Sequence, residues 1–97
     1  MKILALEKEL PKRPGDRFTD KLLEEEARCV WQFHQSGVIR DLYFRADKRA
    51  AVLLLECSTV EDAGSVLSTL PLVRQGLIEF ELIPLTTYSG FERLFKK

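Results

Sequence analysis

The sequence predicts a single α+β domain made of two strand–helix–strand halves, one after the other. Short apolar stretches with the two-residue period of strands alternate with two stretches of helical spacing. Start and stop signals for helices separate them. At 97 residues, the chain is too short for two cores, because chains divide into separate cores only at roughly 250 residues. We therefore expect one domain over residues 1–97.

The first half of the predicted fold is a strand, a loop and a helix. Residues 2–7 alternate loosely and are apolar on both sides, as in a strand. Two prolines and a glycine in residues 11–17 then predict a loop. Thr19 has the position of a helix N-cap, and Gly37 that of the left-handed residue after a helix end. A helix is thus expected between them.

Two further strands follow this helix. Residues 38–45 alternate so that Arg40, Leu42 and Phe44 share one face. After a charged turn, residues 50–57 are apolar on both faces for most of their length. A strand of this kind needs cover on both sides.

The second half closes with a helix, a strand and a tail. Ser58 and Glu61 have the spacing of a capping box, which predicts a helix start, and Pro71 is expected to end that helix. Residues 77–85 alternate as the last strand. The tail, residues 86–97, carries three large apolar side chains with the spacing of one amphipathic turn.

The resulting order, β-α-β-β-α-β, is that of a ferredoxin-like fold, a four-stranded antiparallel sheet with helices on one face. The open face of such a sheet is normally polar, yet the third strand is apolar there as well. Exposed patches of this size usually mark association. We therefore expect a homodimer or higher homo-oligomer, with two sheets packed face to face. The tail either packs on a partner subunit or folds over its own sheet edge.

Composition excludes several classes of partner. Fifteen basic and fifteen acidic residues cancel, so no positive field favours nucleic acid. The longest apolar run, residues 50–55, is far below the ~20 residues that a membrane span needs. The N-terminus has no secretory-signal pattern, so we expect a cytoplasmic protein. Cys29 and Cys57 lack metal-like spacing and are expected to be free thiols. With a single histidine and no glycine-rich phosphate loop, we expect no metal and no cofactor.

Glu26 is the main candidate for chemistry. It lies within the apolar stripe of the first helix, between Leu22 one turn before and Val30 one turn after. Burial raises the pKa of a carboxyl group, which is how a glutamate becomes a useful proton shuttle near neutral pH. The alternative is a structural glutamate, held by an internal hydrogen bond or by Arg40.

Other residues could complete a pocket for a small-molecule ligand. Arg40 could bind a carboxylate or carbonyl group, or form a surface ion pair instead. Besides Leu22, the side chains that we expect to line the pocket are Phe33, His34 and Tyr43. His34 and Tyr43 are also compatible with ordinary packing or surface positions.

Three short motifs resemble muconolactone isomerases. They are GVIRDLYF at residues 37–44, LPL at residues 70–72 and ELIPL at residues 81–85. The resemblance implies a dimeric α+β barrel and a cofactor-free 1,3-proton shift in an unsaturated lactone. In that reaction Glu26 would remove a proton next to a carbonyl, and Arg40 would stabilise the enolate. Residues 73–76 depart from the family by about two extra residues, and the tail has no counterpart.

Two other functions remain open at this point. One is a monooxygenase of the dimeric α+β barrel type, either cofactor-free or haem-linked, and the absence of a histidine well inside the predicted pocket disfavours the haem-linked version. The other is an oligomeric binding module without catalysis, in which the apolar strands and the tail serve assembly.

Overall fold

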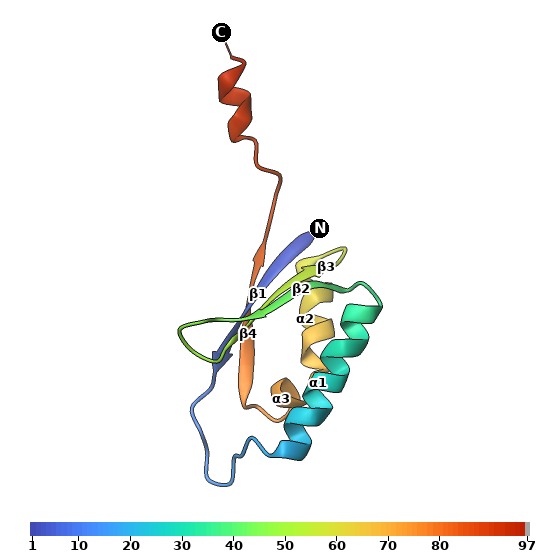
Figure 1. Ribbon diagram of the computed structural model, residues 1–97, viewed down its shortest axis with the longest axis vertical. Helices are drawn as coiled ribbons and strands as arrows, with labels where there is room; N and C mark the ends of the chain where they lie inside the picture. Colours follow the sequence, from blue (N-terminus) through green and yellow to red (C-terminus); the bar gives the residue numbers. More distant parts are fainter. Residues whose placement is uncertain (97) are drawn as a thin grey trace.

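A computed structural model, which describes residues 1–96, has the predicted order of strands and helices with two short additions (Figure 1). The elements are β1 (Lys2–Glu9), α1 (Asp20–Gln35), β2 (Ile39–Phe44), β3 (Ala51–Glu56), α2 (Val60–Ser68), α3 (Pro71–Arg74), β4 (Ile78–Pro84) and the 3-10 helix η1 (Gly90–Leu94). The one-turn helix α3 and the 3-10 helix η1 are the additions, and η1 lies where the spacing in the tail predicted one amphipathic turn. The main elements are each within two residues of their predicted bounds.

The four strands form one antiparallel sheet in the order β2-β3-β1-β4. The two central strands, β1 and β3, pair directly, whereas β2 and β4 lie at the edges. Figure 1 shows α1 and α2 on the same side of this sheet. The prediction of an α+β, ferredoxin-like fold is therefore confirmed.

The hydrophobic core lies between the sheet and the helices. Ile3 and Ala5 of β1 pair with Leu55 and Leu53 of β3, and all four side chains are buried. Helix α2 contributes buried side chains, while α1 contributes only partly buried ones to the core. A second, smaller cluster beside α3 consists of Leu72, Leu77 and Ile78, against which Phe18 and Leu22 pack.

The opposite face of the sheet has an apolar centre that no helix among residues 1–96 covers. It is formed by alternate residues of β1, β3 and β4, which we call the open sheet face: Leu4, Leu6, Val52, Leu54 and Ile83. Ion pairs flank it, with Lys2–Glu56 near one end and Lys8–Glu81 near the other. An apolar centre with a charged rim is the usual anatomy of a protein interface.

Local signals place the helix ends, with one correction. The hydroxyl oxygen of Thr19 accepts a hydrogen bond from the Leu22 N–H (3.1 Å), and Gly37 has a φ of 85°, so both predicted ends of α1 are confirmed. The predicted Ser58 cap is wrong. Thr59 caps α2 instead, by accepting from the Asp62 N–H at 3.0 Å. The two hydroxyl residues are adjacent, and sequence spacing does not decide between them.

Pro71 does not follow directly on the end of α2, as the sequence suggested, but begins α3. The last turn of α2 is closed by side chains, since the hydroxyl groups of Ser68 and Thr69 donate to the carbonyl oxygens of Ser65 and Val66. Proline is favoured at the first position of a helix because that position needs no N–H bond. The chain therefore turns at 69–70 and starts a new helix.

A β-bulge changes the faces of β2. Ile39 pairs with Leu55 and Leu42 pairs with Leu53, with a register shift in between. Ile39 and Leu42 thus face the helices together, and Arg40 falls in the bulge. The simple alternation predicted for Arg40, Leu42 and Phe44 is wrong at Arg40, because a bulge inserts one residue into the two-residue period.

Within residues 1–96, no helix is long and apolar enough to cross a membrane. The same residues contain no cluster of three or more potential metal-ligating side chains. Cys29 and Cys57 are both free and partly buried.

Candidate functional site

Glu26 lies on the inward side of α1 and is half-buried. Its Oε1 atom accepts a hydrogen bond from the N–H of Leu72, at 3.0 Å. Leu72 is the second residue of α3, so the carboxylate caps this one-turn helix from outside. The inward placement follows from the helical spacing of Leu22, Glu26 and Val30, which the sequence already indicated.

The environment of Glu26 raises the pKa of its carboxyl group above the usual value. Burial is the largest cause, because it removes water from the charged form. The hydrogen bond from Leu72 opposes it, the negative charge of Glu7 adds to it, and the positive charge of Arg74 opposes it weakly. Glu26 forms no ion pair with any residue in 1–96.

The second carboxylate oxygen of Glu26 is open to proton exchange. Oε2 has no hydrogen-bond partner among the described residues. Every fully buried side-chain oxygen or nitrogen among these residues has a hydrogen-bond partner, so Oε2 is not fully buried. Oε2 therefore reaches accessible surface. One oxygen fixes the carboxylate in place, and the other remains free to take or give a proton.

Glu7 is a second carboxylate on the same side of the sheet. Its neighbours two and four residues earlier in β1, Ala5 and Ile3, are core residues, and the strand period places Glu7 on their face. Its Oε1 atom accepts from the N–H of Ala51 at 3.0 Å. Glu7 was not among the site residues predicted from the sequence. The two-residue period of β1, counted from Ile3, nevertheless places it on the core face.

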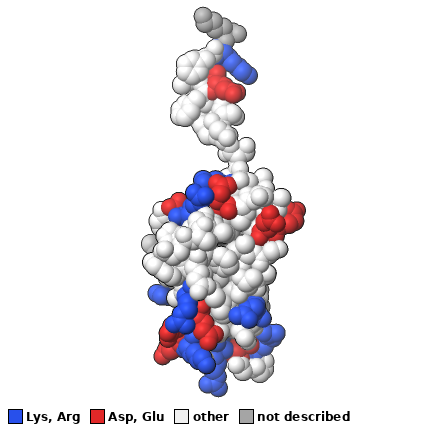
Figure 2. All heavy atoms as spheres, turned by 90° about the vertical axis from the view of Figure 1, so that its right-hand side faces the viewer, with Lys and Arg blue, Asp and Glu red and all other residues white. Residues whose placement is uncertain are grey.

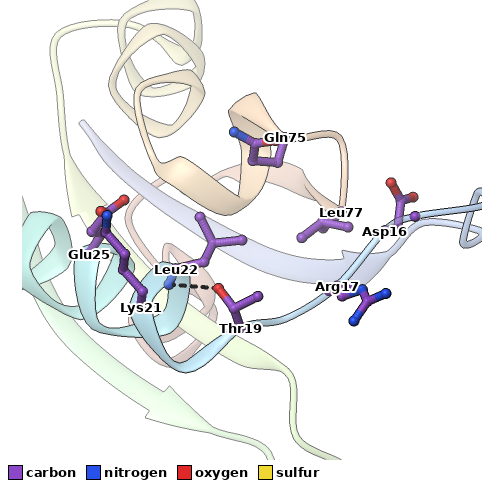
Figure 3. Close-up of a pocket in the computed structure, with 9 residues that line it drawn as sticks. Asp16, Arg17, Thr19, Lys21, Leu22, Glu25, Gln75 and Leu77 are labelled. Carbon is purple, nitrogen blue, oxygen red and sulfur yellow. Dashed lines mark hydrogen bonds between the residues drawn. The ribbon is translucent and has the colours of Figure 1, made fainter.

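A cavity borders this region on the side of the β1–α1 loop. It has a volume of about 410 Å³ and lies between that loop, the start of α1 and the turn into β4 (Figure 3). The residues that line it are Gly15, Asp16, Arg17, Thr19, Lys21, Leu22, Glu25, Gln75 and Leu77. Of the residues predicted for the site, Leu22 alone lines this cavity. Glu26 is not among the lining residues, although Glu25 is.

Contacts of Arg13 connect two of the segments that border the cavity. Its guanidinium Nη2 donates to the carbonyl oxygen of Gln75 at 3.0 Å, which ties the β1–α1 loop to the turn before β4. Its backbone N–H donates to the Asp16 carboxylate at 2.9 Å, and this bond is the main reason why the pKa of Asp16 is lowered. A side chain at Gly76 would meet Arg13, since a Cβ there would lie 2.9 Å from Nη2.

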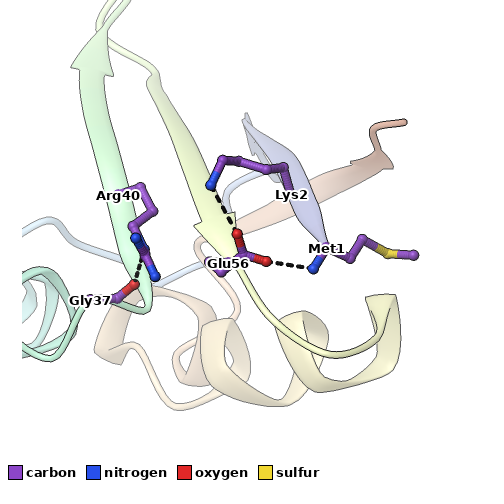
Figure 4. Close-up of polar contacts among 5 residues, drawn as sticks. All are labelled: Met1, Lys2, Gly37, Arg40 and Glu56. Carbon is purple, nitrogen blue, oxygen red and sulfur yellow. Dashed lines mark hydrogen bonds and ion pairs between the residues drawn. The ribbon is translucent and has the colours of Figure 1, made fainter. Parts of the chain in front are cut away.

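Arg40 does not lie with Glu26 in the single chain. Its Nε donates to the carbonyl oxygen of Gly37 at 2.6 Å, and the side chain is exposed at the start of β2 (Figure 4). No ion pair joins it to a carboxylate among residues 1–96. The positive charge that acts on Glu26 is that of Arg74. Arg74 was not among the site residues predicted from the sequence.

The other predicted pocket residues are spread over different surroundings. Phe33 packs against the main core, and the ring of His34 places Nδ1 3.0 Å from the carbonyl oxygen of Ile39. Tyr43 is 66% exposed and pairs with Val52, so it points to the open sheet face. Within one chain, the structure thus brings Leu22 and Glu26 together but leaves His34, Arg40 and Tyr43 apart from them.

Comparison with solved structures identifies the fold. A crystal structure of muconolactone isomerase superposes with a TM-score of 0.76 at 20% sequence identity, covering 93% of this chain and 93% of that one. The fold is that of muconolactone isomerase. The resemblance inferred from three short motifs is thereby confirmed at the level of the fold.

A second solved structure is similar to this chain, with a lower score. It is 5-chloro-2-hydroxyhydroquinone dehydrochlorinase from Burkholderia phenoliruptrix AC1100, in complex with 2,5-dihydroxybenzoquinone. Its TM-score is 0.59 at 15% identity, over 93% of this chain and 98% of that one. No family model and no curated protein matched the sequence. The likeness is therefore one of fold, and the function has to be argued from the site.

Proposed function

We propose that the protein is a cofactor-free isomerase that moves a proton next to a carbonyl group in a small molecule, with Glu26 as the base. The proposal rests on the environment of the Glu26 carboxyl group. It is half-buried, has no ion pair among residues 1–96, and has a raised pKa and one free oxygen. A carboxylate of this kind is enriched at functional sites. The names of the two structural neighbours, an isomerase and a dehydrochlorinase, agree with an enzyme of small-molecule chemistry.

The proposed step needs no oxidant or reductant. Oε2 of Glu26 takes a proton from the carbon beside a carbonyl, and the electron pair of the broken C–H bond moves into an enolate. Glu26 then returns the proton to the far end of the conjugated system, which shifts the double bond. A raised pKa favours this role, because a base works best when its pKa approaches the operating pH.

The enolate needs a positively charged partner, and two arginines are candidates for this role. Arg40, which the family resemblance suggests, does not contact Glu26, so this role needs either a side-chain movement or a second subunit. Arg74 is the alternative donor, since its charge already acts on Glu26. We propose Arg74 as the first of the two to test.

The proposal is tested by replacing Glu26 with glutamine and assaying muconolactone turnover. Glutamine keeps an oxygen that accepts the Leu72 N–H bond but cannot take a proton. We expect kcat/KM to fall by about 10²–10⁴-fold, the usual contribution of a general base. The matched control is Glu24→Gln on the same helix, where the carboxylate is exposed and pairs with Arg28. Equal loss in both variants, or unchanged turnover in Glu26→Gln, would reject Glu26 as the base.

A second function is supported by the same hydrogen bond. If Glu26 serves only to cap α3, the protein is a non-catalytic binding module. In that case Glu26→Gln keeps the cap and does not lower stability, whereas Glu26→Ala lowers stability by about 0.5–2 kcal/mol, the usual cost of a lost cap. Comparing the two substitutions separates the cap from the proton chemistry.

We also propose that the working unit is a homodimer packed through the open sheet face. Five apolar side chains on that face are covered by no helix, and charged pairs surround them. Burial of apolar surface contributes roughly 25 cal/mol per Å², so joining two such faces is favourable.

A further inference from the structure

Helix α3 carries the N–H group that holds Glu26, so whatever fixes α3 also fixes this carboxylate. The helix has only four residues, Pro71–Arg74. A helix of one turn is not stable by itself, because it orders several residues for very few hydrogen bonds. The position of α3 must therefore come from contacts with other segments of the chain.

The two ends of α3 are held in different ways. At its start, Leu70 and Leu72 are buried, and the Leu72 N–H donates to Oε1 of Glu26 at 3.0 Å. At its other end, Arg74 and Gln75 are exposed, so packing does not fix them. Polar contacts therefore decide where the end of α3 lies.

Arg13 of the β1–α1 loop contacts this exposed end. Its Nη2 atom donates to the carbonyl oxygen of Gln75 at 3.0 Å, and the two residues are 62 positions apart in the sequence. Gln75 directly follows α3, and the last carbonyl groups of a helix have no donor within the helix itself. Because a guanidinium group is always charged, it is a strong donor for such a carbonyl oxygen. Arg13 thus fastens the end of α3 to the β1–α1 loop.

The loop holds Arg13 in place in turn. The backbone N–H and Nε of Arg13 both donate to the Asp16 carboxylate, at 2.9 and 3.3 Å, and the Asp16 N–H donates to the Arg13 carbonyl oxygen at 3.0 Å. Charged side chains gather at this end of the molecule, in the lower part of Figure 2. The guanidinium group is therefore presented to Gln75 by a turn that is itself closed by hydrogen bonds.

The turn after α3 connects this contact to Leu72. Gly76, in that turn, has a φ of 73°, and a Cβ there would lie 2.9 Å from Nη2 of Arg13, so the guanidinium group lies directly against the backbone. The next N–H, that of Leu77, donates to the carbonyl oxygen of Leu72 at 3.0 Å. The backbone of Leu72 is thus bonded on one side to the turn that Arg13 holds, and on the other side to Glu26.

We propose that Arg13 is a positioning residue for Glu26: by holding the end of α3, it fixes the Leu72 N–H and thereby the carboxylate that acts as the base. The proposal rests on the proposed function, which gives Glu26 its role. The charges that act on the pKa of Glu26 are those of Glu7 and Arg74. The effect of Arg13 therefore passes through the backbone of α3 and not directly between charges.

Amide hydrogen exchange in the full-length variant Arg13→Ala tests this connection without an assay of activity. We expect the Leu72 N–H to exchange roughly tenfold faster, because α3 opens locally once its end is released. Amides of the central strand β3, such as that of Leu53, should keep their rates. The matched control is Arg17→Ala, which removes a cation from the same loop but keeps the contact with Gln75.

The conservative variant Arg13→Lys should restore most of the protection at Leu72, since lysine retains a charged donor for the Gln75 carbonyl oxygen. Unchanged exchange at Leu72 in Arg13→Ala would overturn the proposal. Equal acceleration at Leu72 and at Leu53 would also overturn it, because Arg13 would then support only the stability of the whole fold.

The kinetics of muconolactone turnover give the second readout. A residue that positions the base acts on the reacting geometry, so Arg13→Ala should lower kcat by about 10–10²-fold. KM should change by less than about twofold, and Arg13→Lys should regain most of the lost kcat. A raised KM with unchanged kcat would assign Arg13 to substrate binding and overturn the positioning role.

The two readouts separate this proposal from the proposed function. Unchanged turnover in Glu26→Gln rejects Glu26 as the base, whereas the exchange of the Leu72 N–H still decides whether Arg13 holds α3. If Glu26→Gln loses turnover but Arg13→Ala keeps the kcat of the unaltered protein, the base stands and the positioning role of Arg13 is wrong.

Discussion

At the scale of single residues, the proton affinity of Glu26 is set by forces of opposite sign. Burial and the charge of Glu7 raise its pKa, whereas the Leu72 hydrogen bond and Arg74 lower it. A carboxyl group whose folded pKa lies above its unfolded value binds more protons in the native state. Its contribution to stability is then lost as the pH rises from the ordinary value of 4.5 through the raised pKa. The ionised form of Glu26 therefore lowers the free energy of unfolding at neutral pH.

We expect Glu7→Gln to lower the pKa of Glu26. Removing the negative charge of Glu7 takes away one of the two causes that raise it. Carboxyl-carbon NMR titration of the full chain measures this directly. Glu9→Gln is the matched control, because Glu9 lies two residues further along β1 on the same face but is exposed. An unchanged Glu26 titration in Glu7→Gln would show that the two carboxylates act independently.

Glu56 provides a test of acid sensitivity with the opposite sign. Hydrogen bonds from Lys2 and from the amino group of Met1 hold its pKa at about 2 (Figure 4). Because the folded pKa lies below 4.5, its stabilising effect is full above that value and is lost as the pH falls towards about 2.

We therefore expect Glu56→Gln to be less stable than the unaltered protein at pH 7. The difference should shrink between pH 4.5 and about 2. Urea unfolding at several pH values measures it. A difference that stays constant over this range would show that the N-terminal ion pairs contribute nothing.

At the scale of elements, the start of α2 can be assigned by experiment. Thr59 accepts the Asp62 N–H bond, whereas no such bond to Ser58 is present among the described residues. Thr59→Ala should cost about 1 kcal/mol of the free energy of unfolding, and Ser58→Ala less than about 0.5 kcal/mol. Denaturant unfolding of both variants gives the comparison. A larger loss of stability in Ser58→Ala than in Thr59→Ala would show that Ser58 is the cap, as the sequence predicted.

The elements that the sequence predicted well are those with strong local signals. Thr19 and Gly37 bound α1 on both sides, and the alternation of residues 77–85 marked β4. The bulge at Arg40 and the short helix α3 were missed, because both depend on contacts between segments far apart in the chain. Ile39 pairs with Leu55 on the neighbouring strand, and the N–H of Leu72 donates a hydrogen bond to Glu26 on another helix.

Within the single chain, the sequence predicted the placement of Glu26 and Leu22 but did not predict that of Arg40, His34 and Tyr43. Helical spacing alone placed Glu26 inward. Arg40, His34 and Tyr43 were grouped with it because they carry suitable side chains, but a bulge, a backbone hydrogen bond and the opposite sheet face separate them. The strand period would have placed Glu7 on the core face, whereas the effect of Arg74 on Glu26 became visible only once α3 was placed against α1.

At the scale of the whole molecule, the surface that remains uncovered determines how copies meet. Both central strands have apolar side chains on the open sheet face as well as in the core. The described residues, 1–96, supply helices for one side of the sheet only. A monomer would expose this face to water, which is why we expect a dimer.

Leu54→Glu should break this contact while preserving the fold. Leu54 lies at the centre of the open sheet face, between Leu4 of β1 and Asp41 of β2, and takes no part in the core. A carboxylate buried there without a partner is costly, so the apparent mass should fall by half in light scattering. The matched control is Ser65→Glu on the exposed side of α2. If Leu54→Glu keeps the mass of the unaltered protein, the open sheet face is not the dimer interface.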